Sequence, residues 1–266
     1  MIIHVLRSRQ QPATVDRKLQ TGIDEGKNMD RIILLIATLL LLFVVGTFIG
    51  FMDRERFSPR WLIIAAALVA LNDAAITSFY GWLPNLLPGA ELNWQGKILA
   101  LAATLCVAAL PAFGWQASGL TLTQAPGSLK SAIPATLVYC AFFVGVALMF
   151  SDGPATGEDV AFQLTIPGFE EEPFWRGILL LSLDRVYAGR VRFLGVDWGW
   201  GALLACTLFG MGHAFDFSDG QFSFDAITMA ATGVPSLLGV WMRQKTGSIL
   251  FPILLHNFGN SFSLLV

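Results

Sequence analysis

The sequence predicts an all-α, polytopic integral membrane protein, a bundle of about eight transmembrane helices. Apolar residues make up 55% of the 266 residues and charged residues only 14%, whereas soluble domains carry more charge on their surfaces. Several stretches approach the roughly 20 apolar residues that a bilayer crossing needs. We expect these stretches to be helices, because backbone groups in lipid must find hydrogen-bond partners within their own segment.

Clusters of Pro, Gly, Asp and Asn separate the apolar stretches, as in "YGWLPNLLPGAELN" and "DFSDGQ", and such clusters indicate loops. Four tryptophans, at positions 94, 115, 198 and 200, fall near the expected helix ends, where membrane proteins place aromatic residues. The expected helices are residues 32–52, 61–80, 92–113, 129–150, 169–183, 198–213, 222–242 and 248–266.

Three regions follow from this pattern. Residues 1–28 are polar and unpatterned, so we expect a disordered tail, and they are too polar for a signal peptide. Met29 stands just before the first apolar stretch and is a candidate translation start. Residues 29–155 form transmembrane helices without a recognisable motif, and residues 156–266 carry the motifs described below.

The distribution of Lys and Arg predicts an orientation. In an eight-helix layout, the loops on one side hold nearly all the loop cations and the opposite loops hold only Lys97. The cation-rich side is expected to be cytoplasmic. The N-terminal segment through Arg31 adds six more cations on the opposite side. A start at Met29 would leave only Arg31 of these, and a missed or reversed first helix would also explain the conflict. The cations of the rich side are Arg54, Arg56, Arg60, Lys130, Arg185, Arg190, Arg192, Arg243 and Lys245.

The segment "GFEEEPFWRG" places three glutamates and an arginine beside a purely apolar run. Ionisable residues within a membrane helix indicate function. We expect the helix to begin near Gly168, so that its first turn holds the glutamates and its dipole favours them. Glu172 and Arg176 can pair four residues apart, while Glu171 points about 100° away and has no obvious local partner. Taken alone, these residues fit a structural ion pair equally well.

Two histidines complete a candidate site. His213 ends the expected sixth helix, one turn after Phe209, and His256 precedes Asn260 by one turn in the last helix. A single histidine in a membrane helix more often forms a hydrogen bond that joins two packed helices than acts as a catalytic residue. However, the antiparallel order of the helices brings both histidines and Asn260 to the depth of Glu171, open to one membrane face. Packing alone does not explain such a cluster.

The remaining polar residues and the cysteines give little indication of a functional site. Asn72 and Asp73, in the second helix, are expected to pack against other helices rather than to line a substrate path. The cysteines, Cys106, Cys140 and Cys206, lie in apolar runs without a CxxC motif and are expected to be buried small side chains. The net charge of -2 indicates no nucleic-acid partner.

Three motifs, in one order, resemble the signature of the CAAX protease and bacteriocin-processing family, also called CPBP or Abi. The resemblance covers about residues 165–263 and also includes "TGSILFPILLHNFGN" around the third motif. Arg176 fixes the register of the first motif and leaves Glu170 outside it. The motifs are Glu171-Glu172-x-x-x-Arg176, Phe209-x-x-x-His213 and His256-x-x-x-Asn260.

The resemblance implies an intramembrane endopeptidase. In this family, Glu171 would act as general base on a water, assisted by His213. His256 and Asn260 would stabilise the oxyanion of the tetrahedral intermediate, and Glu172 with Arg176 would support the site, as would Phe209. The chemistry is sensible, because a positioned carboxylate can take a proton from water and fixed side-chain donors suit an oxyanion.

The resemblance also bears on cofactors, partners and location. Some family members are described as metalloproteases, and zinc would then be held by Glu171, His213 and His256. The sequence lacks HExxH, so we favour a metal-free mechanism without cofactor. The expected partners are a peptide or protein substrate, with or without a lipid modification, and membrane lipids, with the protein in the plasma (inner) membrane. Prenyl-protein relatives act on cytosolic substrates, which opposes the orientation that the loop charges predict.

Two alternatives remain open at this stage. A catalytically idle relative could serve as a membrane scaffold or partner-binding protein, although the intact motifs argue against it. A small transporter could line its path with the same charges, but the sequence shows no inverted repeats.

Overall fold

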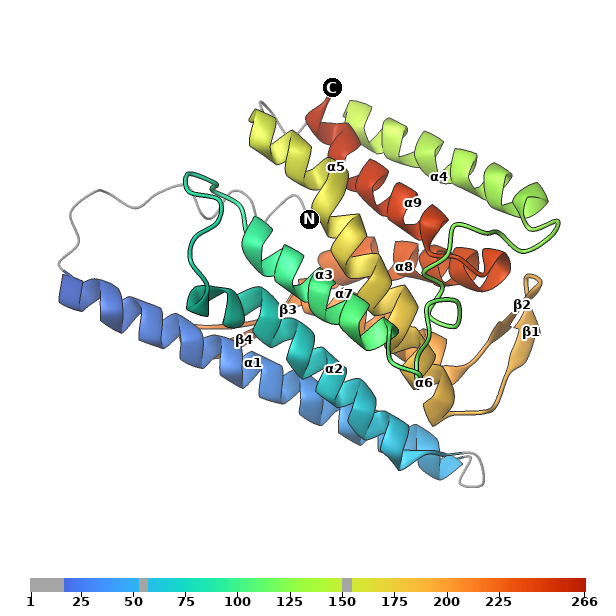
Figure 1. Ribbon diagram of the computed structural model, residues 1–266, viewed down its shortest axis with the longest axis horizontal. Coiled ribbons are helices and arrows are strands. Elements are labelled where there is room, and N and C mark those ends of the chain that lie inside the picture. Colours follow the sequence, from blue (N-terminus) through green and yellow to red (C-terminus); the bar gives the residue numbers. More distant parts are fainter. Residues whose placement is uncertain (1–16, 53–56, 150–154) are drawn as a thin grey trace.

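The computed structural model describes residues 17–52, 57–149 and 155–266 and is mostly helical (Figure 1). Eight helical segments are present in this part of the chain, which confirms the predicted number. Short 3-10 turns, η3 (Phe79–Trp82) and η5 (Phe262–Leu264), follow α2 and α9. The segments are α1 (Arg17–Met52), α2 (Pro59–Thr77), α3 (Trp94–Ala108), α4 (Leu129–Met149), the continuous run α5 (Gly157–Glu172), η4 (Pro173–Leu179) and α6 (Leu180–Val186), α7 (Trp200–Ala214), α8 (Ala226–Thr246) and α9 (Leu250–Ser261).

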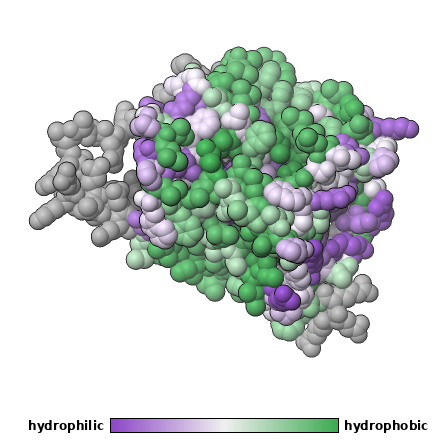
Figure 2. Space-filling view, viewed as in Figure 1, coloured by the Kyte–Doolittle hydropathy of each residue, from purple (hydrophilic) through white to green (hydrophobic). Residues whose placement is uncertain are grey.

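Three of these segments are long and apolar enough to cross a membrane, namely Asn28–Met52, Pro59–Thr77 and Leu129–Met149. Trp94–Ala108 and Trp200–Ala214 are apolar but shorter. Figure 2 shows apolar residues across the middle of the visible face and hydrophilic residues gathered towards opposite edges. These features support a membrane protein, while the expected total of about eight crossings stays a prediction.

The first helix is longer than the sequence predicted. α1 begins at Arg17, within the polar segment for which we expected disorder, and residues 1–16 of that segment lie outside the described residues.

Two β-hairpins are an addition to the predicted all-α fold. β1 (Val191–Phe193) pairs with β2 (Val196–Trp198), and β3 (Phe215–Ser218) pairs with β4 (Gln221–Phe224), both antiparallel. Each has a two-residue turn with positive φ at both positions, Leu194-Gly195 and Asp219-Gly220. This is the turn geometry that matches the twist of a hairpin, and Asp-Gly is one of its typical sequences. The predicted start of the next helix at residue 222 was therefore wrong, and α8 begins at Ala226.

The predicted start of the fifth helix near Gly168 was also wrong. α5 begins at Gly157, where Thr156 and Asp159 form a reciprocal capping box. Pro167 interrupts the helix only locally, because the N–H of Gly168 donates to Oδ1 of Asn257 in α9 at 2.8 Å. The glutamates therefore lie in the middle of a continuous helical run, and no helix N-terminus of their own segment offsets their charge.

A π-helical segment follows the glutamates directly. η4 spans Pro173–Leu179, and Pro173, which lacks an N–H, cannot continue the regular α-helical bonding. Single-turn π segments of this kind occur often at functional sites. Here the segment places Arg176 in the interior, 4% exposed.

Packing brings four helices together around these glutamates. α5 packs against α9 and α3, and α7 packs against α8 and contacts η4. The largest buried cluster joins α1, α2, α6 and α7 and lies beside the glutamates. Its members include Leu62, Leu179, Leu183, Ala205 and Leu208.

The start of α3 is fixed on both of its neighbours. The Asn93 side chain caps α3 by accepting from the N–H of Gly96 and donates to the carbonyl of Ile76 in α2. In α5, the Glu158 carboxylate accepts from the indole N–H of Trp94 and from the N–H groups of Glu91 and Leu92, each at about 3 Å. These backbone donors hold the pKa of Glu158 below its ordinary value. The first turn of α3 therefore has a defined position relative to α5.

The contact between Gly168 and Asn257 predicts a specific sensitivity. A Cβ at Gly168 would lie 2.4 Å from Oδ1 of Asn257, so Gly168→Ala should lower the free energy of unfolding by about 1–3 kcal/mol through overpacking. Gly145→Ala in α4 is the matched control, because its Cβ would meet nothing within 4 Å, and it should leave stability unchanged or raised. Thermal melting of both variants in one detergent tests this, and equal melting temperatures would contradict it.

The orientation prediction can be tested at two surface positions. Arg185, Arg190 and Arg192 follow or end α6, at the end of the bundle opposite the β3–β4 hairpin. In a background without the native cysteines, Ser218→Cys should react with an impermeant maleimide from outside the cell. Gly189→Cys should react only after permeabilisation, because the cation-rich end is expected in the cytoplasm. The reverse labelling pattern would overturn this orientation.

Candidate active site

The ammonium of Lys97 forms an ion pair with Glu171, for which the sequence showed no local partner. The ammonium nitrogen lies 2.6 Å from Oε2 of Glu170 and 2.7 Å from Oε1 of Glu171. The charge count assigned Lys97 to a loop, which was wrong, and the motif register leaves Glu170 outside the first motif. Lys97 lies in the first turn of α3, and the Glu170 side chain is only 1% exposed. A non-local contact between α3 and α5 therefore compensates two of the three glutamates.

The predicted pair of Glu172 and Arg176 is confirmed, with 3.1 Å between Oε1 and Nη1. Both side chains are almost fully buried. The same carboxylate oxygen also contacts Nδ1 of His256 at 2.7 Å. Glu172 accepts here because an ionised carboxylate has no hydrogen to donate, so Nδ1 of His256 is the donor. Glu172 thus connects the first motif to the third.

Phe209 lies at the centre of the three motifs. The Arg176 guanidinium carbon lies 4.2 Å from the centroid of the Phe209 ring, a cation–π distance. The His213 and His256 ring centroids lie 4.8 and 6.1 Å from it. One buried aromatic ring in α7 therefore contacts residues from η4, α7 and α9.

The two histidines have different hydrogen-bond roles. Nδ1 of His213 lies 2.8 Å from the carbonyl oxygen of Phe209 one turn earlier. That oxygen can only accept, so Nδ1 carries the hydrogen, and Nε2 of the neutral ring is free to accept. His256 instead presents Nε2 to Glu171, 3.7 Å from Oε2. Glu171 therefore stands between Lys97 on one side and His256 on the other.

Several polar atoms at this place have unused hydrogen-bonding capacity. Oε2 of Glu171 and Nδ2 of Asn260 are buried and make no hydrogen bond with any residue that the structure describes. Buried polar groups are normally paired. Oε2 of Glu171 can accept from a bound water, and Nδ2 of Asn260, one turn after His256 in α9, is a free donor of the kind that a polarised carbonyl would use.

Zinc is a poor fit to the three candidate ligands as they are arranged. In the described part of the chain, no three His, Cys, Asp or Glu side chains group closely enough to hold a metal ion. One oxygen of Glu171 is also engaged by the Lys97 ammonium, whose charge would repel a cation.

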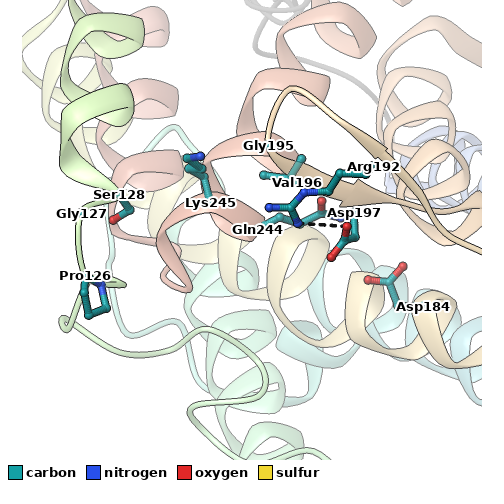
Figure 3. Close-up of a pocket in the computed structure, with 10 residues that line it drawn as sticks. All are labelled: Pro126, Gly127, Ser128, Asp184, Arg192, Gly195, Val196, Asp197, Gln244 and Lys245. Carbon is teal, nitrogen blue, oxygen red and sulfur yellow. Dashed lines mark hydrogen bonds and ion pairs between the residues drawn. The ribbon is translucent and has the colours of Figure 1, made fainter.

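A cavity of about 520 Å³ lies elsewhere, at the end of the bundle that holds β1 and β2 (Figure 3). Asp184 lines it, and Asp184 lies 13 positions beyond Glu171, about 20 Å along the helical run. Arg192 forms an exposed ion pair with Asp197 across its rim. None of the candidate site residues lines this cavity. Its lining is Pro126, Gly127, Ser128, Asp184, Arg192, Gly195, Val196, Asp197, Gln244 and Lys245.

Three residues that the structure places at or beside the site were missed or discounted in the sequence. Lys97 had a signal, because it is a cation at the head of the apolar stretch "ILALAATLCVAAL". Glu170 had a signal in its position beside two other glutamates, but the motif register excluded it. Asn257, which binds the backbone at Gly168, follows His256 directly and had no separate signal.

Residues 159–262 match the family model described as type II CAAX prenyl endopeptidase Rce1-like. The match covers less than half of the chain and includes every candidate residue from α5, η4, α7 and α9. It confirms the resemblance that the three motifs carry and, with the apolar helices, supports a CAAX-type membrane protease in general. No curated protein and no solved structure matches the chain.

The buried Glu172–Arg176 pair predicts a large loss of stability when one partner is removed. Arg176→Ala leaves the buried Glu172 carboxylate without its permanent cation, with only the His256 hydrogen bond remaining, and should cost about 3–5 kcal/mol. Arg192→Ala is the matched control: its pair with Asp197 is more than half exposed and should contribute less than about 1 kcal/mol. Melting curves of both variants test the difference, and similar shifts would contradict a buried pair.

Proposed function

We propose that the protein is an intramembrane endopeptidase that hydrolyses a peptide bond of a membrane-associated protein or peptide. The proposal refines the general assignment to CAAX-type proteases by naming the catalytic groups. Glu171 acts as general base on a water, His213 assists it, and His256 and Asn260 bind the oxyanion. Glu172, Arg176 and Phe209 hold these groups in place.

The observation that carries the proposal is the convergence of the three motifs on Phe209. A structural ion pair at a helix end would need only Glu172 and Arg176. It would not need a histidine from α7 and a histidine from α9 against the same ring. Ionisable groups gathered among membrane helices favour a functional site over packing.

The base step uses the free oxygen of Glu171. Oε2 is buried and without a hydrogen bond among the described residues, so it can accept one proton of a water. Nε2 of His213 can accept from the other hydrogen of that water and orient it. The water oxygen then attacks the substrate carbonyl carbon, and the proton passes to Glu171.

The oxyanion step depends on His256 and Asn260. Nδ1–H of His256 donates to Glu172, so Nε2 can donate to an oxyanion only when the ring carries both hydrogens. Nδ2 of Asn260, buried and free, supplies a second donor from the next turn of α9. When the intermediate collapses, the C–N bond breaks and Glu171 returns its proton to the leaving amine, so that the enzyme is regenerated.

We further infer a metal-free reaction and a substrate that reaches the site from the membrane. The pairing of Glu171 with Lys97 supports the first inference, and the family match supports a lipid-modified peptide as one substrate class. The protein is proposed to reside, multi-pass, in the plasma (inner) membrane.

The test uses quenched fluorescent peptides and purified protein in detergent. One peptide carries a farnesylated Cys followed by three residues, and the second is its unmodified form. Glu171→Gln, His213→Ala and His256→Ala should each lower kcat by about 10²- to 10⁴-fold, and Asn260→Ala by about 10²- to 10³-fold. Because the groups act in one step, pairs of substitutions should be far from additive.

The matched control is Asp73→Asn, a polar substitution in α2 outside the site, which should cleave like the wild type. Wild-type-like cleavage by Glu171→Gln would remove the proposed base. If the wild type cleaves neither peptide, the proposed substrate class is wrong. Retained cellular function in all four site variants would favour a scaffold over an enzyme.

A further inference from the structure

Lys97 is a largely buried cation supplied by α3, outside the segment that matches the protease family. Its side chain is 16% exposed, and those of Glu170 and Glu171 are 1% and 13% exposed. Burying an ammonium group is costly unless the group is paired and hydrogen-bonded. Lys97 meets this condition with two carboxylates, although one would suffice for a simple ion pair.

The two oxygens of Glu171 are not equivalent as a result. Oε1 accepts from Lys97 at 2.7 Å, which fixes the carboxylate from the α3 side. Oε2 points away from that contact, is buried and lies 3.7 Å from Nε2 of His256. Charge-assisted hydrogen bonds are the strong ones, so Lys97 selects which oxygen is held and which is free.

Glu170 acts on Lys97 rather than on the reaction itself. Its Oε2 contacts the ammonium at 2.6 Å, and among the described residues it makes no hydrogen bond with His213, His256 or Asn260. With Glu170 as a second anchor, Lys97 is held at two points and cannot rotate away from Glu171. The pair therefore forms a rigid support for the carboxylate next to it.

The position of Lys97 is itself well determined. It follows by one turn the Asn93 cap and the contact of Trp94 with Glu158, which fix α3 on α2 and α5. Gly96 allows the close approach to α2, since a Cβ there would lie 2.5 Å from the carbonyl oxygen of Ile76. Groups that orient a catalytic residue are effective when they stand on rigid elements of this kind.

We propose that Lys97, with Glu170 as its counter-ion, is a positioning residue that holds Oε1 of Glu171 and so leaves Oε2 as the oxygen that receives the proton of water. This inference rests on the proposed function. It adds two residues to the site: Lys97, from the N-terminal half of the chain, and Glu170, a glutamate outside the family motif.

The test compares Lys97→Met, Lys97→Arg, Glu170→Gln and the double variant Lys97→Met/Glu170→Gln, using the farnesylated peptide. Lys97→Met should lower kcat by about 10²-fold, as misplacement of a reacting group does, with KM changed less than about threefold. Lys97→Arg should recover at least tenfold of that loss, because a guanidinium can donate to both carboxylates.

The double variant separates positioning from stability. Lys97→Met leaves Glu170 buried and unpaired, so its melting temperature should fall, and adding Glu170→Gln should restore most of that fall. The kcat should stay low, because Glu171 still lacks its anchor. Recovery of kcat together with the melting temperature would show that Lys97 serves only the fold and would overturn the proposal.

Glu171→Gln, measured beside these variants, distinguishes the two levels of inference. If Glu171→Gln is inactive while Lys97→Met cleaves with wild-type kcat, the role of Lys97 is wrong and the proposed function stands. If Glu171→Gln cleaves like the wild type, the proposed function fails, and the role of Lys97 fails with it.

Discussion

Charge compensation of three consecutive, largely buried glutamates is the constraint on which this structure depends. An uncompensated carboxylate in such surroundings would be costly by several kcal/mol. Lys97 meets Glu170 and Glu171, and Arg176 with His256 meets Glu172. If the His256 ring carries both hydrogens, the cations equal the carboxylates in number, which is the state that the proposed oxyanion role requires.

This compensation dictates the arrangement of the helices. The cations come from α3, η4 and α9, so those elements must pack around α5 before its glutamates can be buried. Asn257 repairs the backbone where Pro167 interrupts α5, and Asn93 and Glu158 fix the start of α3. Structural polar contacts thus surround the proposed catalytic groups and hold them on rigid helices.

The sequence predicted the local pair and the approach of His256 to the glutamates, but it missed the contact of Lys97 with Glu170 and Glu171, for a physical reason. Glu172 and Arg176 pair because residues four apart share a helix face, which needs no knowledge of the tertiary fold. Lys97 and Glu171 are 74 positions apart, and no local rule relates them. Two local signals are also readable in the sequence: the capping box of Thr156 and Asp159 marks the start of α5, and Asp219-Gly220 is typical of a hairpin turn.

The contribution of α3 changes how the matched segment is interpreted. Residues 159–262 contain all three motifs, but within that segment Arg176 is the only permanently charged cation beside the glutamates. Without α3, Glu170 and Glu171 would be two adjacent carboxylates without the ammonium that joins them, and like charges at this separation repel strongly in a low dielectric. The base could then be held in its ionised, oriented form only at a high cost. α3 is therefore part of the candidate active site although it lies outside the matched segment.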